Sequence, residues 1–210
     1  MKHLILDFET MGTKVYDCAV IDCSFYVFDT DKMISSDPYT TKNIVDIHKC
    51  KLSVQKQVDN YGWKVYSDTI QFWQSQSKEV RKLIVPKETD ITVEEFASEF
   101  FNVLNKAGKI SHWWTRSSSF DPLILWRMME QIGKEQNINQ YLPHWKHRDT
   151  RTFIDAKLNF PKINGFIPIE DTAFWEKAFQ AHNSSWDVLA DLLRIQALLR
   201  AEADLEMIKR

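Results

Sequence analysis

The chain has 210 residues, of which 44% are hydrophobic and 27% charged, and its formal net charge at pH 7 is -2. This length suits one domain over residues 1–210, and the small charge excludes a protein that binds nucleic acid through a global basic field. No apolar run approaches the length of a membrane span and no signal peptide is recognisable, so we expect a cytoplasmic protein without a membrane partner. The three cysteines form no CxxC pair and are predicted to be buried free thiols.

The first predicted element is a strand that ends in two carboxylates. Residues 4–6 are apolar, as in a strand buried on both faces, and Asp7 and Glu9 follow before the breaker Gly12. Side chains two residues apart on a strand point the same way, so Asp7 and Glu9 face one side. Such a pair needs a proton, an arginine or a divalent metal between its members, unless the strand simply frays into an acidic turn. Further carboxylates nearby would decide between these interpretations.

The next part of the chain alternates between predicted strands and short helices. Residues 18–29 are predicted to form a strand hairpinned onto the first, and residues 34–47 an edge strand followed by a loop. A short helix begins at Ser67 or Asp68, and a second helical piece ends before Pro86.

The second half of the chain is richer in helix signals. A capping box at residues 92–95 starts an amphipathic helix that Gly108 ends. The following segments are then predicted: a strand over 109–115, a helix over 123–132 started by Pro122, a basic segment over 144–151, a loop over 159–171, and a final helix over 184–207. This order of elements predicts an α/β domain with a mixed sheet.

Two further acids stand where predicted elements change. Asp121 lies at a strand-to-helix junction, and Asp187 lies in the first turn of the last helix, five residues after His182. Taken singly, Asp121 is explained as a helix N-cap, Asp187 by the helix dipole, and His182 as an ordinary loop histidine. Taken in order after the acidic pair of the first strand, the same residues form a recognisable pattern.

That pattern consists of three motifs in a fixed order: Asp7-Phe8-Glu9-Thr10, Ser119-Phe120-Asp121, and His182-x4-Asp187. It resembles the motifs of the DEDD exonuclease superfamily in its histidine-bearing branch. The resemblance implies a ribonuclease H-like α/β fold, with a mixed five-stranded sheet flanked by helices, and 3′–5′ exonuclease activity.

Other matches make the chain look like the exonucleases A of T-even bacteriophages, and the similarity extends to bacterial exoribonucleases that prefer adenylate tails. These matches cover nearly the whole chain and include Leu6–Gly12, Trp73 with Gln76-Ser77, Arg116, Arg148-Asp149-x-Arg151-Thr152 and Asp191. One departure is Ser117, where many proofreading relatives carry Asn, and it favours the phage branch. A phage-encoded chain would act in the host cytoplasm.

The resemblance implies that Asp7, Glu9, Asp121 and Asp187 hold two divalent metal ions, with Asp7 between them. Four acids without a Cys or His ligand suit hard ions such as Mg²⁺ or Mn²⁺. His182 would take a proton from the attacking water, a task that suits an imidazole with the usual pKa of about 6.5.

The predicted substrate contacts surround these acids. Met11 is either a wedge against the 3′-terminal base or a core residue, and Trp73 either stacks on a base or lies in the core. The other predicted contacts are Thr10, Phe120, Arg116, Arg148 and Arg151. The arginines either bind phosphate or form structural ion pairs.

We therefore predict an enzyme that cuts single-stranded DNA from the 3′ end into mononucleotides, with an adenylate-preferring exoribonuclease as the alternative. A non-catalytic nucleic-acid-binding relative is disfavoured, because clustered carboxylates without a metal are destabilising and would be lost first. A third class is a structural protein whose acids are ordinary caps. The sequence leaves open the choice between DNA and RNA and whether the chain forms a homodimer.

Overall fold

A mixed five-stranded sheet forms the centre of the computed structural model, which describes residues 1–44, 46–159, 164–169 and 181–208. The strands are β1 (Lys2–Thr10), β2 (Val20–Asp29), β3 (His48–Lys51), β4 (Trp113–Thr115) and β5 (His147–Asp149). Their order is β3-β2-β1-β4-β5, with β2 antiparallel to both neighbours and β4 and β5 parallel to β1. The α/β class and the mixed five-stranded sheet predicted above are thus confirmed.

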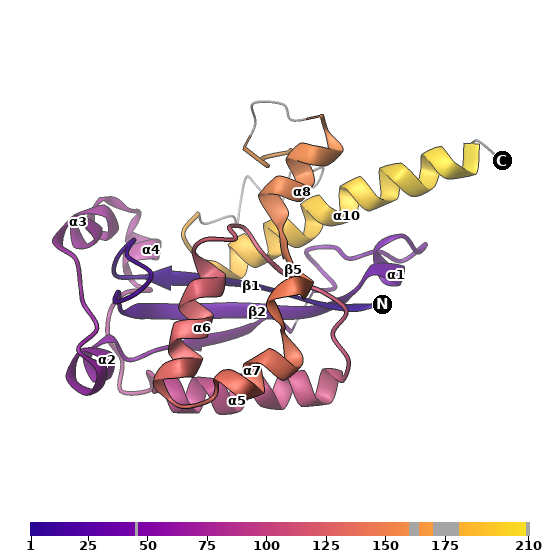
Figure 1. Cartoon of the computed structure of the whole chain (residues 1–210). Coiled ribbons are helices and arrows are strands. Elements are labelled where there is room, and N and C mark those ends of the chain that lie inside the picture. Colours follow the sequence, from indigo (N-terminus) through magenta and orange to yellow (C-terminus); the bar gives the residue numbers. More distant parts are fainter. Residues whose placement is uncertain (45, 160–163, 170–180, 209–210) are drawn as a thin grey trace.

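Helices cover both faces of this sheet (Figure 1). They are α1 (Thr30–Met33), α2 (Val54–Tyr61), α3 (Ser67–Ser75), α4 (Lys78–Arg81), α5 (Val93–Ala107), α6 (Asp121–Gln131), α7 (Glu135–Tyr141), α8 (Thr150–Lys157) and α10 (Ser184–Ile208). The long helix α10 packs with α8 on one side of the sheet, and α5, α6 and α7 lie on the other. Beyond the carboxyl end of β1 lie α3 and α4 (Figure 1).

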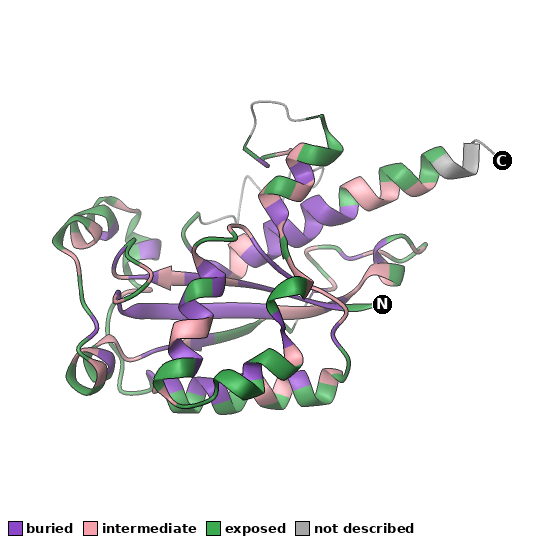
Figure 2. Cartoon of the chain, viewed as in Figure 1, coloured by how far each residue is buried: buried purple, intermediate pink, exposed green. Residues whose placement is uncertain are grey.

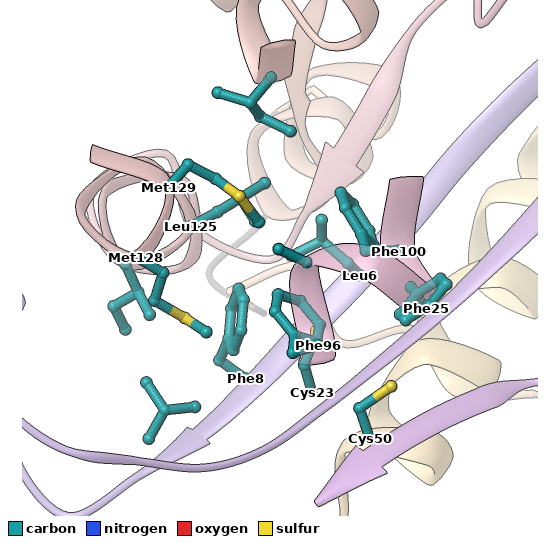
Figure 3. Close-up of a cluster of buried hydrophobic side chains, with 14 of the residues drawn as sticks. Leu6, Phe8, Cys23, Phe25, Cys50, Phe96, Phe100, Leu125, Met128 and Met129 are labelled. Atoms are coloured by element: carbon teal, nitrogen blue, oxygen red, sulfur yellow. The ribbon is translucent and has the colours of Figure 1, made fainter. Parts of the chain in front are cut away.

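The central strand β1 is buried on both faces, and its alternation decides which side chains face which helices. Leu6 and Phe8 belong to the apolar cluster that contains Phe96 of α5 and Leu125 of α6 (Figure 3). Ile5 belongs instead to the cluster built on α10. Because strand side chains alternate, Asp7 and Glu9 continue the Ile5 side and face α10. Burying each of these large apolar side chains contributes about 1.5–3 kcal/mol, which holds the end of β1 in place.

Helix α10 is mostly buried over the half that crosses the sheet, and residues 197–205 beyond it are half-buried or exposed (Figure 2). Its bounds agree with the predicted final helix, and the capping box and Gly108 stop predicted for α5 are also present. Cys18, Cys23 and Cys50 are free and buried, as predicted. No helix among the described residues has the length and apolarity needed to cross a bilayer.

The prediction of an edge strand within residues 34–47 is wrong, because the chain turns there. The edge strand of the sheet follows this segment and is β3. Helices α2 and α7 were not predicted. Helix α2 has clear ends, since Ser53 caps it and Gly62 closes it in the left-handed region, but its buried residue is the polar Gln57. Helix α7 buries only Ile138 and so carries no apolar stripe. The predicted loop over residues 159–171 lies partly outside the described residues.

Gln57 is polar although it lies in the core, because its side chain completes the backbone hydrogen bonding of β2 beside β1. Its side chain accepts a hydrogen bond from Val20 N at 2.8 Å and donates one to Val20 O at 2.8 Å. Val20 is the partner of Thr10 in the sheet, where the register of β1 and β2 shifts between Glu9 and Thr10. Gln57 therefore stabilises the irregular pairing that sets the direction of the Glu9 side chain.

We expect Gln57→Leu to lower the free energy of unfolding by about 1–3 kcal/mol, because it leaves the buried polar groups of Val20 unpaired. Urea unfolding measures this loss. The matched control is Gln55→Leu on the exposed side of α2, which should stay within about 0.5 kcal/mol of the parent. Equal losses for the two variants would contradict the role assigned to Gln57.

Candidate active site

Three of the predicted acids meet at the carboxyl end of β1. Oxygen atoms of Asp7, Glu9 and Asp187 lie within 4.8 Å of one another. Asp7 and Glu9 come from the face of β1 that α10 covers, and Asp187 comes from the first turn of α10. This juxtaposition follows from the packing of α10 across β1 and is the convergence that the order of the motifs predicted.

The fourth acid, Asp121, lies beside these three at the start of α6. Its Oδ1 accepts a hydrogen bond from Phe8 N at 3.1 Å, and its side chain is buried. It does not cap α6, because Phe120 occupies the N-cap position and no side-chain cap is present. The alternative explanation of Asp121 as a helix cap is therefore wrong.

Burial and mutual repulsion make these carboxylates hard to ionise. The pKa of Asp7 is raised well above its usual value by burial and then by Asp121, Asp187 and Glu9. The pKa of Glu9 is also well raised, by burial and then by Asp187. The pKa values of Asp121 and Asp187 rise to about 7, again chiefly through burial. A cluster of this kind, made only of oxygen donors, fits hard divalent cations.

Asp191, one turn after Asp187, ties two arginines beside the cluster. Its Oδ1 lies 2.5 Å from Arg116 Nη1 and 2.9 Å from Arg194 Nη1, and Thr150 Oγ1 donates to its Oδ2 at 2.7 Å. The Arg116 guanidinium also lies 4.0 Å from the centre of the Phe166 ring. Arg116 is thus a structural ion-pair partner, and its predicted role in binding phosphate is not supported.

Among the described residues, neither Arg148 nor Arg151 forms an ion pair or a hydrogen bond with the four acids. Arg148 donates to the carbonyls of Trp145 and His147. Its charge also reaches His3, at the other end of β1, whose pKa is lowered first by burial, then by His112, and less strongly by Arg148. Arg151 is half-buried in α8, and its Nε has no partner among the described residues. The end of β5 itself does lie beside the site, since the charge of Asp149 acts on Asp121.

His182 lies in the turn before α10 with a positive φ of 64°. Its ring meets the Phe72 ring edge-on, with centroids 4.8 Å apart, and also approaches Trp73 at 6.3 Å. The residue as a whole is exposed to solvent, yet the partial burial of its ring lowers the pKa of His182 from the usual 6.5. His182 is therefore neutral at pH 7 and able to accept a proton.

The two residues with alternative core interpretations both belong to the core. Trp73 is only 2% exposed, and its Nε1 donates to Thr10 O at 3.0 Å, so its faces are not available to a base. Met11 is half-buried and packs against the apolar clusters. The structure therefore does not support the wedge and stacking roles predicted for Met11 and Trp73.

A cavity of about 300 Å³ opens beside Glu9. Its lining consists of Phe8, Glu9, Thr10, Gly12, Thr13, Asp68, Thr69, Phe72, Trp73 and Phe120. The predicted contacts Thr10 and Phe120 are among them, whereas Met11 is not. Phe72, which is 39% exposed, was missed as a site residue. The sequence does indicate that Phe72 is exposed, because adjacent residues on a helix point about 100° apart and Phe72 cannot share the burial of Trp73.

The comparisons with known proteins agree with this arrangement. The family model described as the 3′-5′ exoribonuclease Rv2179c-like domain matches residues 2–187. The chain belongs to this family. The exodeoxyribonuclease of Enterobacteria phage T4 is 29% identical over 98% of this chain and 92% of that protein. The family member described here is accordingly a nuclease hydrolase, an exonuclease that acts on nucleic acid.

Solved exonuclease I structures share the fold. E. coli exonuclease I in complex with a dT13 oligonucleotide is 12% identical, with a TM-score of 0.64 over 99% of this chain and 43% of that one. A zinc-bound complex of E. coli exonuclease I with single-stranded DNA is 13% identical, with a TM-score of 0.58 over 96% and 40%. The chain thus spans about two fifths of the length of these proteins, and the likeness confirms the ribonuclease H-like fold.

We expect Asp187→Asn to stabilise the metal-free protein in a pH-dependent way. The folded-state pKa of Asp187 is raised from 3.8 to about 7, so its charged form destabilises the fold as the pH rises through this window. The gain from Asp187→Asn should be absent near pH 4 and complete above pH 7 in urea unfolding with a chelator present. Adding Mg²⁺ should then stabilise the parent more than the variant.

The control is Asp59→Asn on the exposed side of α2, which should show neither effect. A gain of the same size for Asp187→Asn at pH 4 and pH 8 would contradict the repulsion argument.

Proposed function

We propose that this exonuclease removes mononucleotides from the 3′ end of single-stranded DNA by a two-metal mechanism with His182 as the general base. The observation that carries the proposal is the half-buried cluster of Asp7, Glu9 and Asp187, whose member Glu9 lines a cavity with aromatic walls. We further propose that residues 1–210 act as one domain, because α10 packs on β1 from the opposite end of the chain.

The four acids are the proposed holders of two divalent ions, Mg²⁺ or Mn²⁺. When bound, such ions supply an activated water and relieve the charge on the leaving oxygen. Asp7 would be the ligand that both ions share, because Asp121 and Asp187 are the two neighbours whose charges raise its pKa most. Only burial has a larger effect on this pKa. Oxygen atoms of Glu9 and Asp187 lie within 4.8 Å of one of Asp7, and Asp121 accepts a hydrogen bond from the backbone N of Phe8, the residue after Asp7.

His182 is the proposed acceptor of the proton from the attacking water. A general base must be neutral at the working pH and open to the reacting water. The lowered pKa of His182 and its exposure to solvent meet both requirements. Its contact with Phe72 places the ring at the border of the cavity that begins at Glu9.

The cavity is the proposed site of the 3′-terminal nucleotide. Phe72 and Phe120 offer apolar faces, and stacking on aromatic side chains contributes about 1–3 kcal/mol per base. A base that enters such a cavity must be unpaired, so a single strand avoids the cost of opening a duplex. The exonuclease I structures with bound single-stranded oligonucleotides agree with this choice.

The comparisons point in both directions on whether the substrate contains deoxyribose or ribose. The T4 relative is an exodeoxyribonuclease, which favours DNA, whereas the family description is that of an exoribonuclease. Discrimination for RNA needs a partner for the 2′-hydroxyl. The hydroxyl of Thr10, which lines the cavity, already donates to Gly12 O at 2.6 Å. We therefore propose DNA as the substrate and an adenylate-preferring exoribonuclease as the second candidate.

Competition between matched all-deoxy and all-ribo oligonucleotides tests this proposal directly. Each strand carries a 5′ label, so shortening from the 3′ end gives a ladder of labelled products. We expect Mg²⁺- or Mn²⁺-dependent ladders and faster loss of the deoxy strand at limiting enzyme. Faster loss of the ribo strand would select the second candidate, and immediate release of labelled mononucleotide would refute the 3′ direction.

We expect His182→Ala to lower the rate of the chemical step by about 10²–10⁴-fold, because that is the usual contribution of a general base. Metal binding, followed by Mg²⁺-dependent thermal stabilisation, should be unchanged. The parental rate should fall with the protonation of the imidazole at a pH below the usual histidine pKa of about 6.5, because burial lowers the pKa of His182, and this acid limb should be missing from the variant. A variant that keeps the acid limb would identify another group as the base.

A further inference from the structure

A buried polar network lies under the turn that carries His182. Its members, called the Asp22 network below, are Asp22, Ser24, Lys49, Asn183, Ser184 and Ser185. Asp22 is completely buried on β2, where Ser184 Oγ donates to its Oδ1 at 2.5 Å. Lys49 of β3 places Nζ 3.1 Å from Asp22 Oδ2 and 2.9 Å from Asn183 Oδ1. The Ser24 hydroxyl lies 2.7 Å and 2.8 Å from those of Ser184 and Ser185.

The network is next to the acidic cluster but is not part of it. In the pairing of β1 and β2, Glu9 is opposite Asp22 and Asp7 is opposite Ser24. A buried ion pair is seldom more stabilising than apolar residues of the same shape, because both charges must lose their water. Stability alone therefore gives little reason for an aspartate and a lysine here, and the geometry that they impose is the better explanation.

The Asp22 network holds Asn183, the residue next to His182, in place. Asn183 accepts from Lys49, and the Asn183 carbonyl accepts from the amides of Trp186 and Asp187, which start α10. His182 itself has a φ of 64°, a conformation that side-chain-bearing residues rarely adopt and that persists only where the surroundings enforce it. Lys49 acts on this turn from the sheet side, and Phe72 contacts the His182 ring from α3.

We propose that Lys49 is a positioning residue for the exonuclease reaction: by fixing Asn183 on Asp22 it sets the place of the His182 ring. This inference rests on the proposed role of His182 as the base. Lys49 does not touch the reacting atoms in this scheme. It acts through the turn, so its loss should impair the chemical step while the carboxylates stay in place.

The test compares Lys49→Met with the matched control Lys51→Met. Lys51 lies on the same strand and also pairs with a buried aspartate, Asp90, at 3.3 Å, but it is not connected to the turn. We expect Lys49→Met to lower kcat by about 10- to 100-fold, the usual cost of misplacing a catalytic group by an ångström or less, with KM unchanged. Lys49→Arg should restore most of the rate, and Lys51→Met should keep the parental kcat.

Combining each lysine variant with His182→Ala separates positioning from general damage. If Lys49 acts through His182, Lys49→Met costs nothing further in the His182→Ala background. A further loss in that background, or a weaker Mg²⁺-dependent thermal stabilisation, would overturn the proposal and assign Lys49 to the carboxylates. If the single variant His182→Ala keeps the parental rate, His182 is not the base. This outcome refutes the proposed function and is recognised without any variant of Lys49.

A readout independent of activity is the NMR spectrum of the imidazole protons. The His182 ring lies against the Phe72 ring, so its proton shifts report its position. Lys49→Met should move these shifts in the metal-free protein, and Lys51→Met should not. Unchanged shifts with Lys49→Met would overturn the proposal.

If Lys49→Met fails to fold, Asn183→Ala takes its place, because it cuts the connection to the turn and leaves the buried ion pair of Asp22 intact. It should lower kcat and move the His182 shifts in the same way. A parental kcat for Asn183→Ala would overturn the proposal.

Discussion

Repulsion among carboxylates that the fold forces together is the constraint on which this structure depends. Asp7, Glu9, Asp121 and Asp187 are brought to one place, and burial makes each of them resist ionisation. Two apolar clusters, one on each face of β1, supply the stabilisation that opposes this repulsion. The charged form of the cluster therefore destabilises the fold, and a bound cation would relieve this repulsion.

The cations nearest this site are arranged so that they do not neutralise it. Arg116 and Arg194 are tied to Asp191, and Lys49 is tied to Asp22. Each of these aspartates raises the pKa of a neighbouring acid of the cluster, Glu9 or Asp187, and each of its lysine or arginine partners lowers that pKa by less. In the described part of the chain, the carboxylate oxygens of the cluster thus form no ion pair with these cations and remain available to a divalent ion.

Local rules predicted the parts of the site that depend on local geometry. Strand alternation predicted that Asp7 and Glu9 face one way, and motif order predicted their meeting with Asp187. The rules failed where the outcome depends on distant partners. The pairing of Arg116 with Asp191 joins residues 75 positions apart, and α2 was missed because its buried Gln57 serves Val20 on another element. Of the adjacent aromatic pair on α3, the indole of Trp73 has a buried acceptor, which leaves Phe72 exposed.

The route of the chain through the site has a consequence for biosynthesis. Asp7 and Glu9 leave the ribosome long before Asp187, which belongs to α10 and joins them only once α10 has packed on β1. A nascent chain without α10 therefore lacks one of the three acids that lie within 4.8 Å of each other. The metal site proposed above can thus form only after α10 has been synthesised and has packed on β1.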